Sequence, residues 1–197
     1  MEIVTHIIEL DKELFLLLNG WHTPFFDWVF EYVSFKYTWI PLYLWWLYEI
    51  VQKEKKQFYF PLIWIILVIT LSDQISVHLF KNVFQRLRPC HNPDIQHLVH
   101  IVNNHCGGKY GFVSSHAANT FALVTVVSNL LYRQKRKIKV LLFVWATIVA
   151  YSRVYLGVHY PLDIIAGAIL GWTIGQGMWK FYQFILPRLR KFPRSRF

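Results

Sequence analysis

Charged side chains are scarce in this sequence: they make up 16% of its 197 residues, whereas hydrophobic residues make up 55%. A soluble globular domain usually carries about 25% charged residues, so this balance excludes an ordinary soluble domain. Acidic residues are fewest, 11 against 21 lysines and arginines, which gives a formal net charge of +10. In a soluble protein such a charge would suit nucleic acid. Here the charges cluster between apolar runs, so we expect no nucleic-acid partner.

Cysteines and linker-like segments are also few. The two cysteines, Cys90 and Cys106, both lie in the loop 89–111. If this loop faces an oxidising compartment, we expect a disulfide between them; the alternative is two free thiols. No internal repeat or low-complexity linker divides the chain, and its first residues lack the basic start and small-residue cleavage site of a signal peptide. We therefore expect one domain, 1–197, with no cleaved leader among these residues.

Apolar runs that could form membrane helices fill most of the chain. A span needs about twenty residues, so the first and shortest run must borrow flanking residues. Nine tryptophans, eleven tyrosines and sixteen phenylalanines fit aromatic belts at a bilayer surface. The sequence thus predicts an all-α, polytopic membrane bundle of about five transmembrane helices. The runs cover residues 37–51, 58–80, 112–132, 138–156 and 160–186.

Two shorter segments precede the apolar runs. Apolar and acidic residues alternate at roughly helical spacing over 3–18, which predicts an amphipathic helix on the membrane surface. The aromatic segment 21–34 predicts a short interfacial helix. We divide the domain accordingly into interfacial helices (1–35), a transmembrane core (36–186) and a basic cytoplasmic tail (187–197) that is poorly ordered at its end.

Three basic clusters give the orientation of this bundle. They cover residues 53–56, 133–139 and 180–196, which lie after the first, third and fifth apolar runs. All three clusters therefore fall on one side of the membrane, which the positive-inside rule makes cytoplasmic. The loop 89–111 and the motifs described below fall on the other side.

Small and polar residues inside the runs suggest helix contacts. Gly167, Gly171 and Gly175 recur every four residues, a spacing that lets two helices approach closely in lipid. Asp73 lies inside the second run, where an ionisable residue marks a pathway or bonds to a neighbouring helix, for example to Asn119 or Thr120.

The stretch 152–163, Ser-Arg-Val-Tyr-Leu-Gly-Val-His-Tyr-Pro-Leu-Asp, brings an arginine, a histidine and a carboxylate together. Gly157 can end the preceding helix, and Pro161 can begin the next one. If that helix starts near His159, then His159 and Asp163 share one face. A carboxylate bound to one imidazole nitrogen fixes the tautomer and leaves the other nitrogen free to act as a nucleophile. The alternative is a helix-boundary histidine beside a surface acid.

A second motif, Lys-Asn-Val-Phe-Gln-Arg-Leu-Arg-Pro, covers residues 81–89. Lys81 and Arg88 are seven residues apart, which places them on one face of a helix that Pro89 ends. Two cations on one face can bind two oxygens of a phosphate. The alternative is a set of cations that anchor the end of a span at the membrane surface, an interpretation that suits Arg86.

A third motif, Val-Ser-Ser-His, covers residues 113–116 at the start of an apolar run. Serines at a helix start cap it and present free backbone N–H groups, which makes the helix start an anion site. His116 beside that site could donate a proton to a leaving oxygen.

In this order the three motifs resemble those of the type 2 phosphatidic acid phosphatase superfamily, membrane lipid phosphatases related to vanadium haloperoxidases. The resemblance covers roughly residues 58–180 and preserves the internal spacings. One motif departs from the family pattern, since the family usually has Pro-Ser-Gly-His where this chain has Val113-Ser114-Ser115-His116. Serine at the glycine position keeps the backbone N–H that would bind phosphate.

The resemblance implies a role for each motif residue. His159 would attack phosphorus and form a phosphohistidine, Asp163 would orient it, and His116 would protonate the departing lipid oxygen and then activate water. Phosphoryl transfer depends mainly on positioning and charge stabilisation, which the remaining residues supply without a metal. The implied phosphate-binding residues are Lys81, Arg88, Ser114, Ser115 and Arg153.

We predict no metal site and no cofactor. The sequence shows no pair of carboxylates beside histidines, and the loop histidines have only Asp94 near them in the chain. We expect these histidines to be solvated rather than ligating; they are His91, His97, His100 and His105.

The resemblance implies an enzyme whose partners are the bilayer and a lipid phosphate. The substrates to expect are undecaprenyl diphosphate, a lipid A phosphate or phosphatidylglycerol phosphate, hydrolysed at the periplasmic face of a bacterial inner membrane. An alternative is a phospholipid-binding or transport protein that uses the same cationic pocket without chemistry. A haloperoxidase is disfavoured by the membrane architecture. The sequence is silent on oligomeric state and on the lipid entry route.

Overall fold

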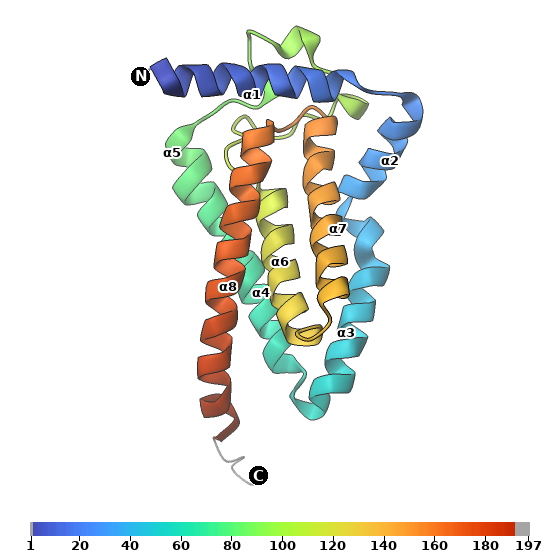
Figure 1. Ribbon diagram of the computed structural model, residues 1–197, viewed down its shortest axis with the longest axis vertical. Helices are drawn as coiled ribbons and strands as arrows, with labels where there is room; N and C mark the ends of the chain where they lie inside the picture. The colour runs from blue at the N-terminus through green and yellow to red at the C-terminus, as the bar shows by residue number, and fades with distance from the viewer. Residues whose placement is uncertain (1, 192–197) are drawn as a thin grey trace.

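The structure, a computed structural model, describes residues 2–191, with side chains up to residue 188. The described chain is 81% helical and has no strands, which confirms the predicted all-α class. Five long helices form an upright bundle (Figure 1). They are α3 (Ile40–Glu54), α4 (Tyr59–Ile75), α6 (Ser115–Leu131), α7 (Arg136–Tyr155) and α8 (Pro161–Lys191).

Two amphipathic helices lie outside this bundle, as the sequence predicts. Helix α1 (Glu2–Gly20) crosses one end of the bundle, and α2 (Pro24–Ser34) descends along its side (Figure 1). Thr23 caps α2 by accepting a hydrogen bond from the amide of Phe26, and Pro24 occupies its first position. Helix α1 buries Phe15 against the bundle and exposes apolar side chains such as Ile3 and Leu17, which fits a helix at a membrane surface.

Length and hydropathy identify two of the helical segments as candidate spans. They are Tyr59–Phe84, with mean hydropathy 1.8, and Arg136–Tyr155, with mean hydropathy 1.5. The first comprises α4, a π-helical turn (Ser76–Lys81) and the short α5 (Asn82–Phe84).

The centre of the bundle is the contact between α6 and α8, and the predicted glycines allow it. A Cβ atom at Gly171 would lie 2.0 Å from the carbonyl oxygen of Ala118, and one at Gly175 would lie 2.6 Å from Thr125 Cβ. Because no side chain fits there, glycine lets the two helix backbones touch. Helix α4 is tied to α6 by the predicted bond of Asn119 Nδ2 to Asp73 Oδ1, 3.2 Å.

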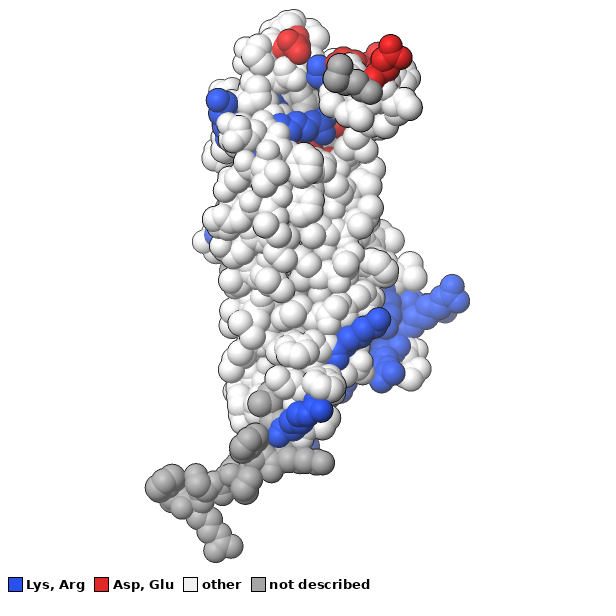
Figure 2. Space-filling model, turned by 90° about the vertical axis from the view of Figure 1, so that its left-hand side faces the viewer, with Lys and Arg blue, Asp and Glu red and all other residues white. Residues whose placement is uncertain are grey.

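The two ends of the bundle differ in charge. The α3–α4 turn (Lys55–Gln57), the α6–α7 turn and the end of α8 lie together, opposite α1 (Figure 1). On the face shown in Figure 2, this end carries lysine and arginine, and the acidic side chains lie at the other end. The long loop between α5 and α6 lies beside α1, with 3₁₀ turns at Pro89–His91, Gln96–Leu98 and Val102–Asn104.

Two predicted helix limits are wrong. The helix before Pro89 ends at Phe84, because Gln85 adopts a left-handed conformation with φ 48°. Lys81 and Arg88 therefore do not share a helical face. Helix α8 continues to Lys191, through Pro187 and into the segment predicted as a basic tail. The remainder of that tail, 192–197, lies outside the described residues.

Candidate active site

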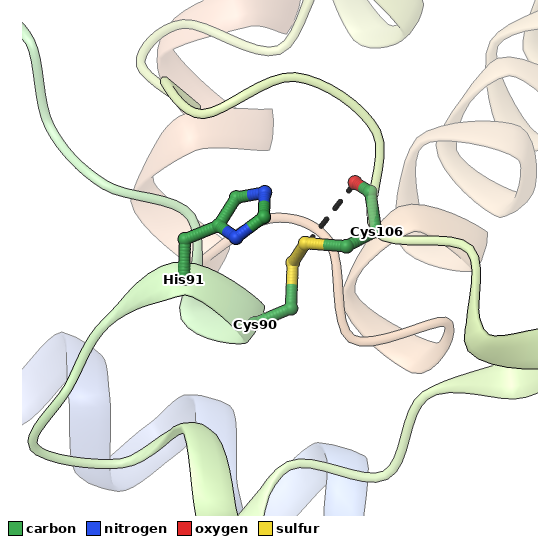
Figure 3. A group of neighbouring side chains, drawn as sticks. All are labelled: Cys90, His91 and Cys106. Atoms are coloured by element: carbon green, nitrogen blue, oxygen red, sulfur yellow. Dashed lines mark hydrogen bonds between the residues drawn. A yellow bond between two sulfur atoms is a disulfide. The ribbon is translucent and has the colours of Figure 1, made fainter.

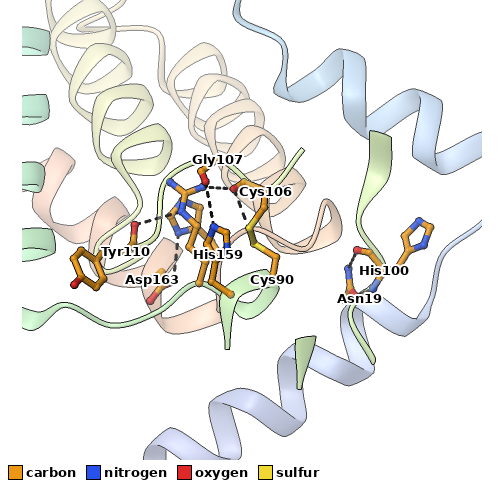
Figure 4. Close-up of a disulfide and its surroundings, with 10 residues drawn as sticks. Asn19, Cys90, His100, Cys106, Gly107, Tyr110, His159 and Asp163 are labelled. Carbon is orange, nitrogen blue, oxygen red and sulfur yellow. Dashed lines mark hydrogen bonds and ion pairs between the residues drawn. A yellow bond between two sulfur atoms is a disulfide. The ribbon is translucent and has the colours of Figure 1, made fainter. Parts of the chain in front are cut away.

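His159 and Asp163 form the buried centre of the site. Gly157, with φ 78°, ends α7, and Pro161 begins α8, so His159 lies just before the helix rather than inside it. The pair nevertheless meets: His159 Nδ1 is 3.3 Å from Asp163 Oδ2 (Figure 4). The amide of Tyr160 donates to the same oxygen at 3.0 Å. His159 is 2% exposed and Asp163 is 0% exposed.

This geometry suits His159 for nucleophilic attack. A carboxylate only accepts hydrogen bonds, so Nδ1 carries the proton and Nε2 keeps its lone pair. Burial, together with the charges of Arg88, Arg153 and Lys81, holds the pKa of His159 well below its ordinary value. The imidazole is therefore neutral at physiological pH, the state that a nucleophile needs.

Arg88 is held against His159 by the outer loop. Its guanidinium donates to the carbonyl of Cys106 at 2.9 Å and to that of Tyr110 at 3.3 Å. A Cβ atom at Gly111 would lie 3.3 Å from Arg88 Cγ and 3.5 Å from His159 Nδ1. The absence of a side chain at Gly111 therefore allows the loop to lie close to both Arg88 and the imidazole.

A disulfide holds the loop in this position. The structure joins Cys90 and Cys106, sixteen residues apart, with the His91 ring alongside (Figure 3). His91 Nε2 is 3.2 Å from the carbonyl oxygen of Gly107. The bond fixes the Cys106 carbonyl that orients Arg88, so it positions a candidate phosphate-binding residue.

The start of α6 supplies the third part of the site. Ser114 caps the helix by accepting from the amide of Ala117 at 3.4 Å. Its own amide donates to the carbonyl of Asp163 at 3.0 Å, which joins the motif 113–116 to the stretch 152–163. The amides of Ser115 and His116, in the first turn, have no acceptor within the helix and can bind an anion. Ser114 thus acts here through capping, with its side chain fully buried.

Lys81 reaches the same helix start. Its ammonium group donates to Ser115 Oγ at 2.8 Å, and Ser115 Oγ also lies 2.7 Å from Ser76 Oγ. The π-helical turn at Ser76–Lys81 thus brings Lys81 to α6 even though the helix ends before Arg88. The two cations converge through the fold and not through helical spacing.

Arg153 approaches from the last turn of α7. One of its terminal nitrogens donates to Ser34 Oγ at the end of α2. Its Nε is buried and has no hydrogen-bond partner within the described residues. A buried donor without a partner is costly, so this nitrogen is suited to a bound anion.

Arg86 is the residue that the sequence interpretation missed. It is not an anchor at the membrane surface: it donates to Asp163 Oδ1 at 2.9 Å and to Asp11 Oδ2 at 2.6 Å. Its guanidinium also lies 4.0 Å from the centre of the Tyr160 ring. Asp11 in turn accepts from the amide of Leu162 at 2.9 Å. The guanidinium of Arg86 therefore links α1, through Asp11, to the start of α8, through Asp163.

The two carboxylates of this network are buried, so they depend on their hydrogen-bond partners. The side chains of Asp11 and Asp163 are 2% and 0% exposed. Burial raises the pKa of Asp11, and the bonds from Arg86 and from the Leu162 amide oppose that rise. A buried carboxylate without such partners would be strongly destabilising. In an extended segment, side chains two residues apart lie on the same face, so the spacing of Arg86 and Arg88 carried no signal that the two would have different partners.

Two cavities adjoin the site. An apolar cavity of about 530 Å³ lies between α3, α4 and α6, with Trp46, Ile65 and Leu123 among its lining residues. A second cavity of about 390 Å³ lies between the end of α2, the outer loop and the end of α7. Both cavities include His116 in their walls.

Within residues 2–191, two groups of side chains have the composition of metal sites. Cys90 and Cys106 are bonded to one another, so they offer no thiolate beside His91. His22, Asp27 and His100 hold their ligand atoms within 4.8 Å of one another. His100 Nε2 bonds to Asp27 Oδ1 at 2.9 Å and its ring stacks on His22 at 3.6 Å. Asp27 is 73 residues away from His100 in the chain, so the sequence, in which only Asp94 is near these histidines, gave no sign of this pair.

Comparison with known proteins agrees with the motifs. The family model of the PAP2 superfamily matches residues 62–186. A lipid A 4′-phosphatase of Bacteroides thetaiotaomicron is 38% identical over 91% of this chain and 78% of its own length. A lipid A 4′-phosphatase of Porphyromonas gingivalis is 35% identical over 93% of this chain and 77% of its own.

Solved structures show the same fold. A PAP2-type phosphatidylglycerolphosphate phosphatase from Bacillus subtilis superposes with a TM-score of 0.69 at 21% identity, over 97% of this chain and 90% of that one. Aquifex aeolicus LpxE superposes with a TM-score of 0.61 at 28% identity, over 85% of this chain and 93% of that one.

Proposed function

Because the chain belongs to the PAP2 superfamily and is a membrane lipid phosphatase, we propose that it removes a phosphate monoester from lipid A, at the 4′ position. The observation that carries this proposal is a neutral histidine, His159, that is bound to a buried carboxylate and lies in the field of three cations, in a site whose second histidine, His116, borders an apolar cavity. The substrate is the one in the names of two relatives that match most of the chain.

In the first step, the Nε2 lone pair of His159 forms a bond to phosphorus while the bond from phosphorus to the lipid oxygen breaks. His116 gives a proton to that oxygen, and the lipid alcohol leaves. Asp163 keeps the proton on Nδ1 and stabilises the positive charge that the ring acquires. Lys81, Arg88 and Arg153 neutralise the charge that develops on the phosphoryl oxygens.

In the second step, His116, now neutral, removes a proton from water, and the resulting hydroxide attacks phosphorus. The bond from phosphorus to Nε2 breaks, and inorganic phosphate leaves with the new oxygen. His159 returns to its neutral form and His116 to its protonated form, so the cycle closes without any cofactor. The amides at the start of α6 face the same oxygens in both steps.

The apolar cavity supplies the place for the lipid chains. Its walls come from α3, α4 and α6, and it reaches His116 at the phosphate site. Acyl chains in this cavity would leave the phosphate beside the imidazole, so we propose that substrate enters between α3 and α4. The basic end of the bundle faces the cytoplasm by the positive-inside rule, which puts the site on the periplasmic side of the inner membrane.

The test is phosphate release by detergent-purified protein in the presence of EDTA. The panel contains lipid A, undecaprenyl diphosphate and phosphatidylglycerol phosphate. We expect the highest kcat/KM with lipid A, loss of the 4′-phosphate by mass spectrometry, and no turnover by a folded His159→Ala variant.

Two results would overturn the proposal. Full activity of His159→Ala would eliminate the phosphohistidine mechanism. Tight lipid binding without turnover by the unmodified protein would instead support the alternative, a binding or transport protein. A higher kcat/KM with undecaprenyl diphosphate would refute lipid A as the preferred substrate and leave the phosphatase class intact.

A further inference from the structure

The wall of the smaller cavity combines apolar residues, such as Val102 and Leu156, with four polar side chains that the catalytic steps do not use. Glu31 and Lys36 come from the end of α2 and the turn after it, and Asn103 and His105 come from the outer loop. Asn103 Nδ2 donates to Glu31 Oε1, so the loop and α2 meet across the cavity. A carboxylate, an amide, an imidazole and an ammonium group thus line one hollow of about 390 Å³.

This cavity begins where the phosphate would lie. His116 and Arg153 form part of its wall, and it shares Ser34, Lys36 and His116 with the apolar cavity. A lipid whose phosphate contacts His116 therefore has two different spaces beside it. The apolar cavity is suited to the hydrocarbon chains of the lipid. The smaller cavity is then open to the part of the substrate that is neither phosphate nor hydrocarbon.

The wall chemistry selects what that remainder is. Carboxylate and amide oxygens accept hydrogen bonds from hydroxyl and amide groups, and the amide and ammonium nitrogens donate to hydroxyl and carbonyl oxygens. Lys36 offsets the charge of Glu31, and Arg153, which also lines the cavity, is assigned to the phosphate that His159 attacks. The set is suited to a neutral group with many hydroxyls and amides.

We propose that this cavity is the subsite for the sugar headgroup of the phosphorylated lipid, with Glu31 and Asn103 as its specificity-determining residues. The inference rests on the proposed function, since it assigns the part of the substrate that carries the phosphate. Asn103 lies at φ 55°, a conformation that asparagine tolerates, and its bond to Glu31 fixes both side chains. The subsite is therefore largely formed before substrate binds.

The test compares two lipids that share a phosphate monoester and acyl chains and differ in the sugar. The first lipid is a phosphorylated, acylated glucosamine disaccharide, which carries the sugar. The second is phosphatidic acid, which has no sugar. We expect Glu31→Gln and Asn103→Gly each to lower kcat/KM about tenfold for the first lipid and to leave the second unchanged. Glycine is chosen because it keeps the positive φ of Asn103 without strain. Glu13→Gln, an exposed change of the same charge on α1, is the matched control.

Binding separates this proposal from the proposed function. In a His159→Ala background, which cannot turn substrate over, Glu31→Gln should still weaken binding of the glucosamine lipid about tenfold relative to phosphatidic acid. Equal losses on both lipids would mean that Glu31 only supports the fold and would overturn the subsite. Unaltered binding of both lipids would overturn it as well. Failure of the unmodified protein to hydrolyse either lipid would count against the catalytic proposal, while the binding comparison still decides the subsite.

Discussion

Replacing Arg86 by lysine removes the fork that holds Asp11 and Asp163 at 2.6 and 2.9 Å. A lysine ammonium is a point charge, so it cannot reproduce two divergent bonds to two carboxylates. One buried carboxylate would then lose its partner, a cost of about 1–3 kcal/mol. Full removal in Arg86→Ala would cost about 3–5 kcal/mol, a large part of the usual stability of about 5–15 kcal/mol. Lysine is therefore the more informative substitution.

The expected kinetic effect follows from the position of Asp163. Arg86 holds one oxygen of the carboxylate whose other oxygen orients His159. A loosened carboxylate misdirects the imidazole, so we expect kcat to fall about 10–100-fold, as for other residues that orient a reacting group. KM should change little, because the cations that would bind phosphate remain.

The assay is steady-state phosphate release together with thermal unfolding in detergent. Arg133→Lys, an exposed change in the turn between α6 and α7, is the matched control and should match the unmodified protein. If Arg86→Lys retained the kcat and the unfolding temperature of the unmodified protein, the positioning role of Arg86 would be wrong. A rise in KM alone would assign Arg86 to substrate binding instead.

Four further outcomes are expected. The pKa of His159 is lowered below its ordinary value of 6.5, so the ring is still neutral at that pH. In a plot of kcat/KM against pH, the acid limb should therefore lie below pH 6.5. The same ring protonates more readily when unfolded, so stability should decline as pH falls through about 6.5, measured by unfolding at several pH values. Replacing both Cys90 and Cys106 by alanine should cost about 3 kcal/mol of stability and raise KM for lipid phosphate, and an unchanged KM would separate the disulfide from the site. Gly171→Ala should lower the unfolding temperature because its Cβ would meet the α6 backbone at 2.0 Å, whereas Gly177→Ala, with nothing within 4 Å, should not.

Local patterns in the chain were enough to predict the helices and the motif residues. Apolar runs of fixed length predicted the bundle, because a membrane-embedded backbone must satisfy its own hydrogen bonds. The glycines at intervals of four in α8 predicted its close contact with α6, because spacing on a helix determines which residues share a face. The pairing of His159 with Asp163 was also predicted, although the helix begins two residues later than expected.

The route by which Lys81 and Arg88 meet was not predictable from spacing. The motif suggested one helical face, but the left-handed Gln85 ends the helix between them. A single residue with positive φ has no reliable signature when it is not glycine or asparagine. The loop that carries Arg88 back to the site is instead held by the Cys106 carbonyl and by the space at Gly111.

The amino-acid sequence was sufficient to identify the reactive groups and most of the helices, because helical period and run length are local properties. Which of these groups contact one another depends on the folded arrangement. Asp11 and Leu162 are 151 residues apart and meet through a hydrogen bond, and Arg86 joins Asp11 to Asp163. Such partners depend on how whole helices pack. The buried carboxylate of Asp11 on α1 therefore orients Arg86, and Arg86 in turn binds Asp163, the partner of His159.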